Sequence, residues 1–151
     1  MSIPDPEITD PDLPDLTVLQ LWQLAVTFEA RLAAELSVLD LSVASFRLIG
    51  EVMRAPDGLR QGELARRLGV RPPTVSTAVA RLEKGGLLRR VPDPDDPRAR
   101  RVTLAPGADL SAGVEVLARL EAAVTAGFDA DELTQARAAL STFTQRLTET
   151  P

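Results

Sequence analysis

The chain contains no cysteine and no histidine among its 151 residues. Without cysteine it can form neither a disulfide nor a thiolate nucleophile, and without either residue it lacks the usual ligands of a zinc site. A histidine general base is excluded for the same reason. No glycine-rich phosphate loop, nucleophile–base set or plausibly placed carboxylate pair stands in for these groups. We therefore expect no catalytic site, no bound metal and no cofactor, and the sequence does not favour an enzyme.

Aromatic residues and long apolar runs are also scarce. Phe, Trp and Tyr make up 3% of the chain, whereas 44% of it is hydrophobic, so Leu, Val and Ala must fill the core. Such a core is common in helical proteins, because Ala and Leu have high helix propensity. No run of about 18 apolar residues is present to span a membrane, and the N-terminus lacks the pattern of a signal peptide. We expect a single-domain, soluble, cytoplasmic protein.

Positive charge is scarce overall but concentrated in one segment. The chain carries a net charge of −5, yet residues 60–101 hold eleven Arg or Lys and five Asp or Glu, a net charge of +6. Charges are screened beyond roughly 8 Å at physiological salt, so a local basic patch can still contact phosphate. The acidic remainder would suppress loose binding to nucleic acid.

The apolar spacing predicts a mainly α fold with a small β-hairpin. Residues 1–15 carry four Pro and five acidic residues and are predicted to form a disordered acidic tail. Asp40 is predicted to cap the second helix, and Gly69 to end the third in a left-handed conformation. Asp129 and Glu132 resemble a capping box before the last helix. The predicted helices cover residues 16–36, 41–55, 62–68, 72–84 and about 110–128, and a last helix runs from the capping residue Asp129 to about residue 147.

The hairpin is predicted from two strand-like segments separated by a loop. Residues 87–91 and 100–104 are the strands, and residues 92–97, with three Pro and three Asp, are expected to be loop throughout. Leu59 and Arg60 are a candidate third, very short strand.

Two helices carry apolar residues on two faces. The first has one stripe through Leu32 and Leu36 and a second through Val18, Trp22 and Val26, and the helix after residue 110 has the same character. A helix that is apolar on two faces is buried on two sides. In a chain this small, one side is expected to face a partner subunit, which predicts a homodimer.

Residues 72–84 have the pattern of a DNA-recognition helix. Val75, Val79 and Leu82 share one face and are expected to bury against Leu48, Leu64 and Leu68. Short hydroxyl side chains near the start of the helix can approach base edges, and the helix N-terminus favours a phosphate. Basic side chains farther along would meet the DNA backbone. The candidate DNA contacts on this helix are Pro73, Thr74, Ser76, Thr77, Arg81 and Lys84.

The hairpin supplies the second set of candidate contacts. Arg98, at the end of the loop, is expected to enter a minor groove. Asp96 is expected to pair with an arginine and fix the loop, whereas Asp93 and Asp95 are interpreted as turn residues alone. Arg100 is a further candidate contact. Because side chains alternate along a strand, about half of Arg89, Arg90, Arg100 and Arg101 should face DNA, and the sequence does not say which.

Residues 61–104 contain a series of short motifs: Glu63-Leu64-Ala65, Leu68-Gly69-Val70, Pro73-Thr74-Val75-Ser76, Arg81-Leu82-Glu83, Gly86-Leu87-Leu88, Arg90, Asp96-Pro97-Arg98 and Val102-Thr103-Leu104. In these motifs the segment resembles the MarR (multiple antibiotic resistance regulator) family of bacterial transcription factors, and the order of the flanking helices extends the resemblance to residues 16–148. It implies a winged helix-turn-helix over residues 41–105 and dimerisation helices over 16–40 and 106–148. It also implies a homodimer that binds a pseudo-palindromic operator in double-stranded DNA, usually as a repressor relieved by a small aromatic or anionic ligand.

One residue departs from the family pattern. Arg71 stands where family members usually place a Ser or Thr cap before the recognition helix, and losing a capping hydroxyl costs around 1 kcal/mol. Pro72 partly offsets this by presetting the backbone, and Arg71 is a candidate phosphate contact.

Sensing by thiol oxidation or by a histidine-rich zinc site is excluded, so a small molecule or a partner is left as the signal. The resemblance implies a ligand pocket between the helical region and the winged region. Trp22, Phe28, Phe46 and Arg47 lie on helices that could line it. The alternative function is a winged-helix module that binds protein and has lost DNA binding. Arg98 and the hydroxyl-rich helix face argue against that alternative.

Overall fold

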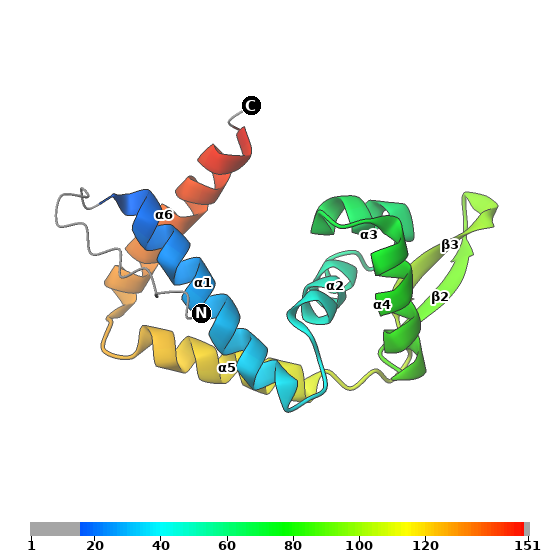
Figure 1. Ribbon diagram of the computed structural model, residues 1–151, viewed down its shortest axis with the longest axis horizontal. Coiled ribbons are helices and arrows are strands. Elements are labelled where there is room, and N and C mark those ends of the chain that lie inside the picture. The colour runs from blue at the N-terminus through cyan, green and yellow to red at the C-terminus, as the bar shows by residue number, and fades with distance from the viewer. Residues whose placement is uncertain (1–15, 150–151) are drawn as a thin grey trace, which may run out of the picture.

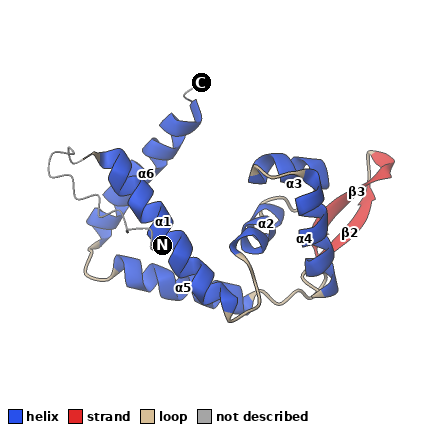
Figure 2. Ribbon diagram, viewed as in Figure 1, coloured by secondary structure: helices blue, strands red, loops and turns tan. Residues whose placement is uncertain are grey.

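The computed structural model describes residues 16–149, which form two lobes (Figure 1). The predicted acidic tail, residues 1–15, lies outside the described residues. One lobe holds α2, α3, α4 and the β-hairpin, and the other holds α1, α5 and α6. The elements are α1 (Thr17–Ser37), α2 (Val43–Met53), β1 (Leu59–Arg60), α3 (Gln61–Leu68), α4 (Pro72–Lys84), β2 (Leu88–Asp93), β3 (Asp96–Leu104), α5 (Ser111–Thr125) and α6 (Ala130–Glu149). Figure 2 shows helices in both lobes and the hairpin at one end. The predicted fold class, mainly α with a small β-hairpin wing, is confirmed.

The winged lobe has its own core, built from one face of each of its elements. Val75, Val79 and Leu82 of α4 are buried, as predicted, in a cluster that contains Leu48 and Leu64. Leu68 is partly buried against the same cluster. The remaining buried members are Ile49, Val52, Leu59, Ala65, Leu88 and Val102. This packing fixes which face of α4 remains exposed.

The sheet is antiparallel, with the strand order β1-β3-β2. The short strand predicted at Leu59–Arg60 is confirmed, and it pairs with Val102 and Arg101 of β3. The prediction that residues 92–97 are all loop is wrong, because β2 continues to Asp93 and β3 begins at Asp96. Proline is tolerated on an edge strand, where its missing N–H breaks no ladder bond, and near the tip both strands are edges.

The helical lobe buries far less apolar surface. Its core consists of Leu32 and Leu36 of α1 with Val116 and Leu120 of α5. No residue of α6 is buried. The stripe of Val18, Trp22 and Val26 is exposed in a single copy of the chain, with Trp22 at 65%. Large apolar residues are also exposed farther along, at Val114, Leu117, Val124, Phe128, Leu140 and Leu147.

Helix ends confirm two predictions and correct one. Gly69 ends α3 with a φ of 67°, and the capping box is present, with Asp129 and Glu132 each accepting the other's backbone N–H at 2.9 Å. The prediction that Asp40 caps the second helix is wrong. Ser42 is the N-cap and accepts from the backbone N–H of Ser45. Asp40 instead occupies the turn before α2, with a φ of 53°, a conformation that Asp adopts more readily than most residues.

Within residues 16–149, no helix is both long enough and apolar enough to cross a bilayer.

Candidate nucleic-acid interface

Helix α4 presents a polar face away from the core of the winged lobe. The helix begins after Arg71, whose side chain makes no capping hydrogen bond, and Pro72 occupies its first position. Arg71 is exposed beside the helix N-terminus, where backbone N–H groups lack intrahelical partners and a phosphate is favoured. The departure from a Ser or Thr cap thus places a cation at this end of the helix.

The predicted contact residues of α4 lie on its exposed face. Pro73, Thr74, Ser76 and Thr77 are all exposed. The Thr77 hydroxyl donates to the carbonyl of Pro73 at 3.1 Å, so its orientation is fixed. The hydroxyl side chains on this face are short and polar, as close approach to base edges requires.

The two basic residues at the end of α4 differ in their surroundings. The guanidinium of Arg81 contacts Asp40, with Nη2 at 2.8 Å from the backbone carbonyl and 2.9 Å from the carboxylate. Lys84 has no ion-pair partner among residues 16–149 and is exposed. The sequence pattern grouped these residues as backbone contacts, whereas the structure ties Arg81 to the turn between the lobes and leaves Lys84 available.

Arg98 is carried by a bulge near the tip of the wing. The register of the hairpin runs to Pro92 opposite Arg100 and then shifts, so that Asp93 faces Asp96. Residues 97–99 of β3 therefore have no partner on β2. A bulge of this kind re-aims a side chain, and Arg98 is exposed here, with its backbone N–H donating to Oδ1 of Asp96 at 3.0 Å.

The acidic residues of the wing have other roles than predicted. Asp93, interpreted as a turn residue, is buried and lies 2.6 Å from Nε of Arg60 and 3.0 Å from Nε of Arg101. Asp95 lies 2.9 Å from Nη2 of Arg101. Asp96, expected to pair with an arginine, accepts a backbone N–H instead. The interpretation failed because the strands were ended too early, which hid the row of side chains across the sheet.

Charged hydrogen bonds from these two arginines set the ionisation of Asp93. The pKa of the Asp93 carboxyl is held well below its usual range, first by the side-chain hydrogen bond from Arg60 and then by that from Arg101. The backbone N–H of Asp95 also donates to Oδ1, at 2.9 Å. The carboxylate is therefore ionised and fully used by its neighbours.

The four strand arginines divide between the core side and the solvent. Arg90 turns toward α4, where Glu83 accepts from both its backbone N–H, at 2.8 Å, and its guanidinium. Arg101 is held by Asp93. Arg89 reaches the hydroxyl of Thr103 at 3.4 Å. Arg100 is exposed and has no ion-pair partner in the described part of the chain.

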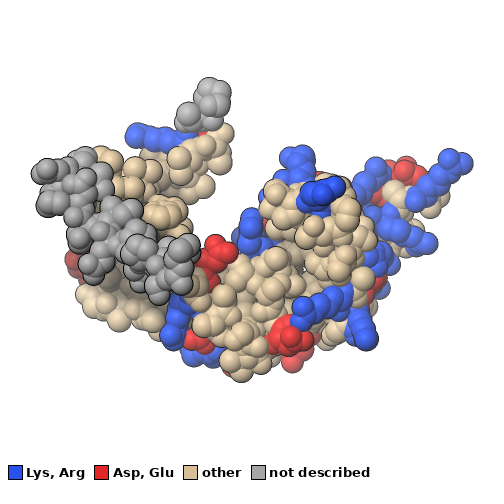
Figure 3. Space-filling view, in the orientation of Figure 1, with Lys and Arg blue, Asp and Glu red and all other residues tan. Residues whose placement is uncertain are grey.

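Basic side chains consequently gather over the winged lobe. Figure 3 shows Lys and Arg along this lobe and at the wing. Beside α4 and on the wing, Arg71, Lys84, Arg98 and Arg100 are exposed and have no ion-pair partner among residues 16–149; Arg47 and Arg89 are also exposed without one, and Arg89 reaches Thr103. The first four cations and the polar face of α4 form the candidate nucleic-acid interface.

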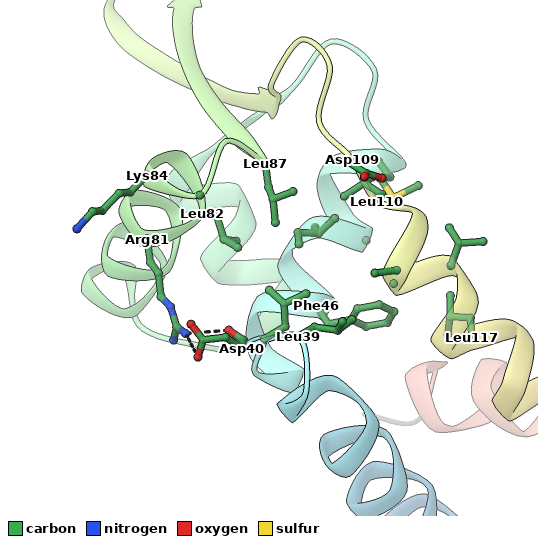
Figure 4. Close-up of a pocket in the computed structure, with 18 of the residues that line it drawn as sticks. Leu39, Asp40, Phe46, Arg81, Leu82, Lys84, Leu87, Asp109, Leu110 and Leu117 are labelled. Atoms are coloured by element: carbon green, nitrogen blue, oxygen red, sulfur yellow. Dashed lines mark hydrogen bonds and ion pairs between the residues drawn. The ribbon is translucent and has the colours of Figure 1, made fainter.

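A cavity of about 950 Å³ lies between the lobes, where α2, the end of α4 and the start of α5 meet (Figure 4). Its walls are mainly apolar, and Arg54, Arg81, Lys84, Asp40 and Asp109 add charge. Hydrogen bonds from the Ser111 hydroxyl and backbone N–H lower the pKa of Asp109, so it is an anion here. The apolar lining includes Leu39, Leu41, Phe46, Ile49, Met53, Leu82, Leu87, Leu110, Val114 and Leu117.

One of the four predicted pocket residues lines this cavity. Phe46 does, and it lies near Leu39 and Leu117 (Figure 4). Trp22, Phe28 and Arg47 are not among its lining residues, and Trp22 and Phe28 are exposed. The sequence analysis did not predict the other lining residues, because they come from segments far apart in the chain. Apolar periodicity is read within one helix, and it does not show which residues of three different helices meet around a cavity.

A family model described as the MarR family matches residues 39–99, which covers α2 to the wing tip. Over this segment the chain is similar to the MarR family. Members of the MarR family are transcription regulators rather than enzymes. The match includes α4 and Arg98 and ends just before Arg100.

Solved structures with the MarR-family fold match most of the chain. The transcriptional regulator PA3341 is 29% identical, with a TM-score of 0.73, over 89% of this chain and 100% of that one. Wild-type MarR from E. coli, in its apo form, is 22% identical, with a TM-score of 0.72, over 85% and 96%. MepR from S. aureus in complex with DNA is 19% identical, with a TM-score of 0.64, over 87% and 96%.

Proposed function

We propose that this protein is a sequence-specific DNA-binding transcription regulator that acts as a homodimeric repressor on a pseudo-palindromic operator. The observation that carries the proposal is the polar outer face of α4, flanked by Arg71 at its N-terminus and by Arg98 and Arg100 on the wing. Short exposed hydroxyl groups suit close approach to base edges, and exposed cations without acidic partners suit contact with phosphates or a minor groove. The solved complex of MepR with DNA supports the assignment, because its fold is shared.

The homodimer is supported by the apolar surface of the helical lobe. Exposed apolar side chains recur along α1, α5 and α6, including Trp22, Val124 and Leu147. Monomeric proteins rarely expose contiguous apolar patches of more than a few hundred Å². Pairing two copies through these helices would bury the stripes and place two α4 helices for two half-sites.

The cavity between the lobes is the proposed effector site. Its apolar walls suit a ring or hydrocarbon body, and Arg54, Arg81 and Lys84 suit an anionic group. Arg81 lies on α4 and also contacts Asp40 of the turn before α2. A bound anion would compete for this guanidinium, which links occupancy of the cavity to the position of the DNA-contacting helix.

DNA fragments selected from the parent genome by the wild-type protein provide the test of DNA binding. The decisive variant combines Arg71→Ala, Arg98→Ala and Arg100→Ala. A matched control removes three exposed arginines from the helical lobe, Arg31, Arg119 and Arg137, each of which has an acidic partner in that lobe. Surface pairs of this kind contribute little to stability.

Affinity measured against salt concentration separates the outcomes. Each phosphate contact contributes about 0.9 to the slope of log K against log salt, so the triple variant should lower the slope of a dimer by up to about 5. The control should keep the wild-type slope and, by light scattering, the wild-type mass. If no fragment is retained at low salt, or if the triple variant binds as wild type does, DNA binding through this face is refuted and a protein-binding module becomes the better explanation.

The effector is tested with 2-naphthoate and its neutral analogue 2-naphthalenemethanol. Naphthoate should raise the melting temperature and release the selected DNA, and the alcohol should do so less. Arg81→Gln should reduce that difference between the two compounds. Equal effects of acid and alcohol on the wild type would contradict the anionic preference.

A further inference from the structure

The strongest feature outside the proposed contact residues is a row of charged side chains across the three strands. Arg60 of β1 pairs in register with Arg101 of β3, and Asp93 of β2 lies against both. The side chain of Asp93 is 0% exposed. We name Asp93, Arg60, Arg101 and Asp95 the Asp93 cluster.

The Asp93 carboxylate accepts three hydrogen bonds from residues of the described chain. Oδ2 accepts from Nε of Arg60 at 2.6 Å and from Nε of Arg101 at 3.0 Å. Oδ1 accepts from the backbone N–H of Asp95 at 2.9 Å. An ionised carboxylate is acceptor-only and matches three donors, whereas an asparagine of the same shape would turn an NH₂ group toward them.

The Asp93 cluster holds both ends of the bulge that carries Arg98. Residues 97–99 lack partners on β2, because the register passes from Pro92 opposite Arg100 to Asp93 opposite Asp96. Asp95 lies just before the bulge and Arg101 just after it, and both contact Asp93. Arg101 also reaches the carboxylate of Asp95 at 2.9 Å, which closes the loop between them.

We propose that Asp93 is a positioning residue for Arg98, fixing the length and direction of the bulge so that the guanidinium meets DNA at one depth. This inference rests on the proposed DNA-binding function. Asp93 does not contact DNA itself, because it is enclosed by the two arginines. Arg60 is also the N-cap residue of α3, so the Asp93 cluster includes the start of that helix. The Asp93 cluster therefore ties the wing to the helix that precedes α4.

A double-mutant cycle on a duplex selected by the wild-type protein tests this coupling. Asp93→Asn and Arg98→Ala should each weaken binding at least tenfold. In the Asp93→Asn background, Arg98→Ala should weaken binding less than threefold, because an Arg98 that is already misplaced contributes little affinity. Fully additive effects would overturn the proposal.

Glu83→Gln is the matched control. Glu83 also accepts one backbone N–H and one guanidinium, both from Arg90, but it holds the base of the hairpin rather than the bulge. Its effect on affinity should add to that of Arg98→Ala. Coupling to Arg98 as strong as that of Asp93 would show a general loosening of the wing and would refute a specific role.

A readout without DNA distinguishes failure of the inference from failure of the proposed function. Amide exchange at Asp95 and Arg98, whose N–H groups donate to Asp93 and Asp96, should be at least tenfold faster in Asp93→Asn, while exchange in α4 is unchanged. If the wild type binds no duplex but exchange rises in this way, the regulator assignment fails and the ordering role of Asp93 survives. Unchanged exchange in the wing overturns that role. Arg60→Gln, which removes one half-exposed donor, should give the same pattern more weakly and serves if Asp93→Asn does not fold.

Discussion

Replacing Gly58 with alanine should destabilise the protein by about 3 kcal/mol. Gly58 has a φ of 78°, and a left-handed conformation costs roughly 1–2 kcal/mol for a residue with a Cβ. The added Cβ would lie 2.6 Å from Cγ2 of Thr103 and 2.9 Å from the backbone carbonyl of Val102. Overpacking of this kind costs about 1–3 kcal/mol more, because the carbonyl belongs to β3 and cannot move without the sheet.

Two other glycines separate the contributions. Gly69 has a φ of 67°, and a Cβ added there would meet no atom of the described residues within 4 Å, so Gly69→Ala should show the backbone cost alone, about 1 kcal/mol. Gly62 lies inside α3 with open space around it. Because Gly62 is in the first turn of this helix, Gly62→Ala should stabilise the protein only modestly, by up to about 0.5 kcal/mol, as alanine loses less conformational freedom than glycine on folding.

Thermal unfolding at one fixed protein concentration measures all three, since a dimer's melting temperature depends on concentration. A cost of about 3 kcal/mol should lower the melting temperature of a chain of this size by about 10 °C. Because Gly58 directly precedes β1, the same variant should loosen Arg60 and weaken DNA binding. If Gly58→Ala costs no more than Gly69→Ala, the close approach to β3 has no energetic weight and the reasoning fails.

The remaining predictions concern the wing, the subunit interface and acid stability. Arg98→Ala should weaken binding to the selected DNA at least tenfold without lowering the melting temperature, because its exposed side chain makes no ion pair within residues 16–149; equal affinity would contradict this. Light scattering at micromolar concentration should give the mass of a dimer, and Trp22→Asp should shift it toward the monomer; a monomeric wild type would be inconsistent with the exposed stripes. The pKa of Asp93 is lowered by Arg60 and Arg101, so its stabilisation is fully present above the ordinary aspartate pKa near 3.9 and is lost as pH falls further. The stability gap between wild type and Asp93→Asn should therefore shrink below about pH 4 in urea titrations, and a constant gap would refute the linkage.

The helices and their buried faces were accessible from the sequence because they depend on local spacing. Val75, Val79 and Leu82 recur at helical intervals, and burial of that face leaves Thr74 and Ser76 outside. Gly69 and the pair Asp129/Glu132 act within a single turn of chain, so their predicted roles were confirmed. Asp40 failed as a cap because Ser42, two residues later, competes for the same role.

The wing and the cavity required contacts between distant residues. Asp93 and Arg60 are 33 positions apart, and nothing in the local pattern around Pro92 signals that β2 continues past it. Ending the strand at residue 91 made Asp93 look like a turn residue. Likewise, Phe46 lines the cavity whereas Trp22 and Phe28 do not, because aromatic character does not reveal which helix face another segment covers.

The sequence by itself determined the helical elements, the hairpin, the exposed polar face of α4 and the local excess of positive charge, since each is set by neighbours within a few residues or one turn. Only the tertiary structure decided which cations are free. Arg60, Arg81, Arg90 and Arg101 carry the same charge as Arg98 and Arg100, but packing brings acidic partners to the first four, whereas the last two have no ion-pair partner within residues 16–149. The physical reason is that availability of a charge depends on which groups are close in space, and chain folding sets those distances across tens of residues.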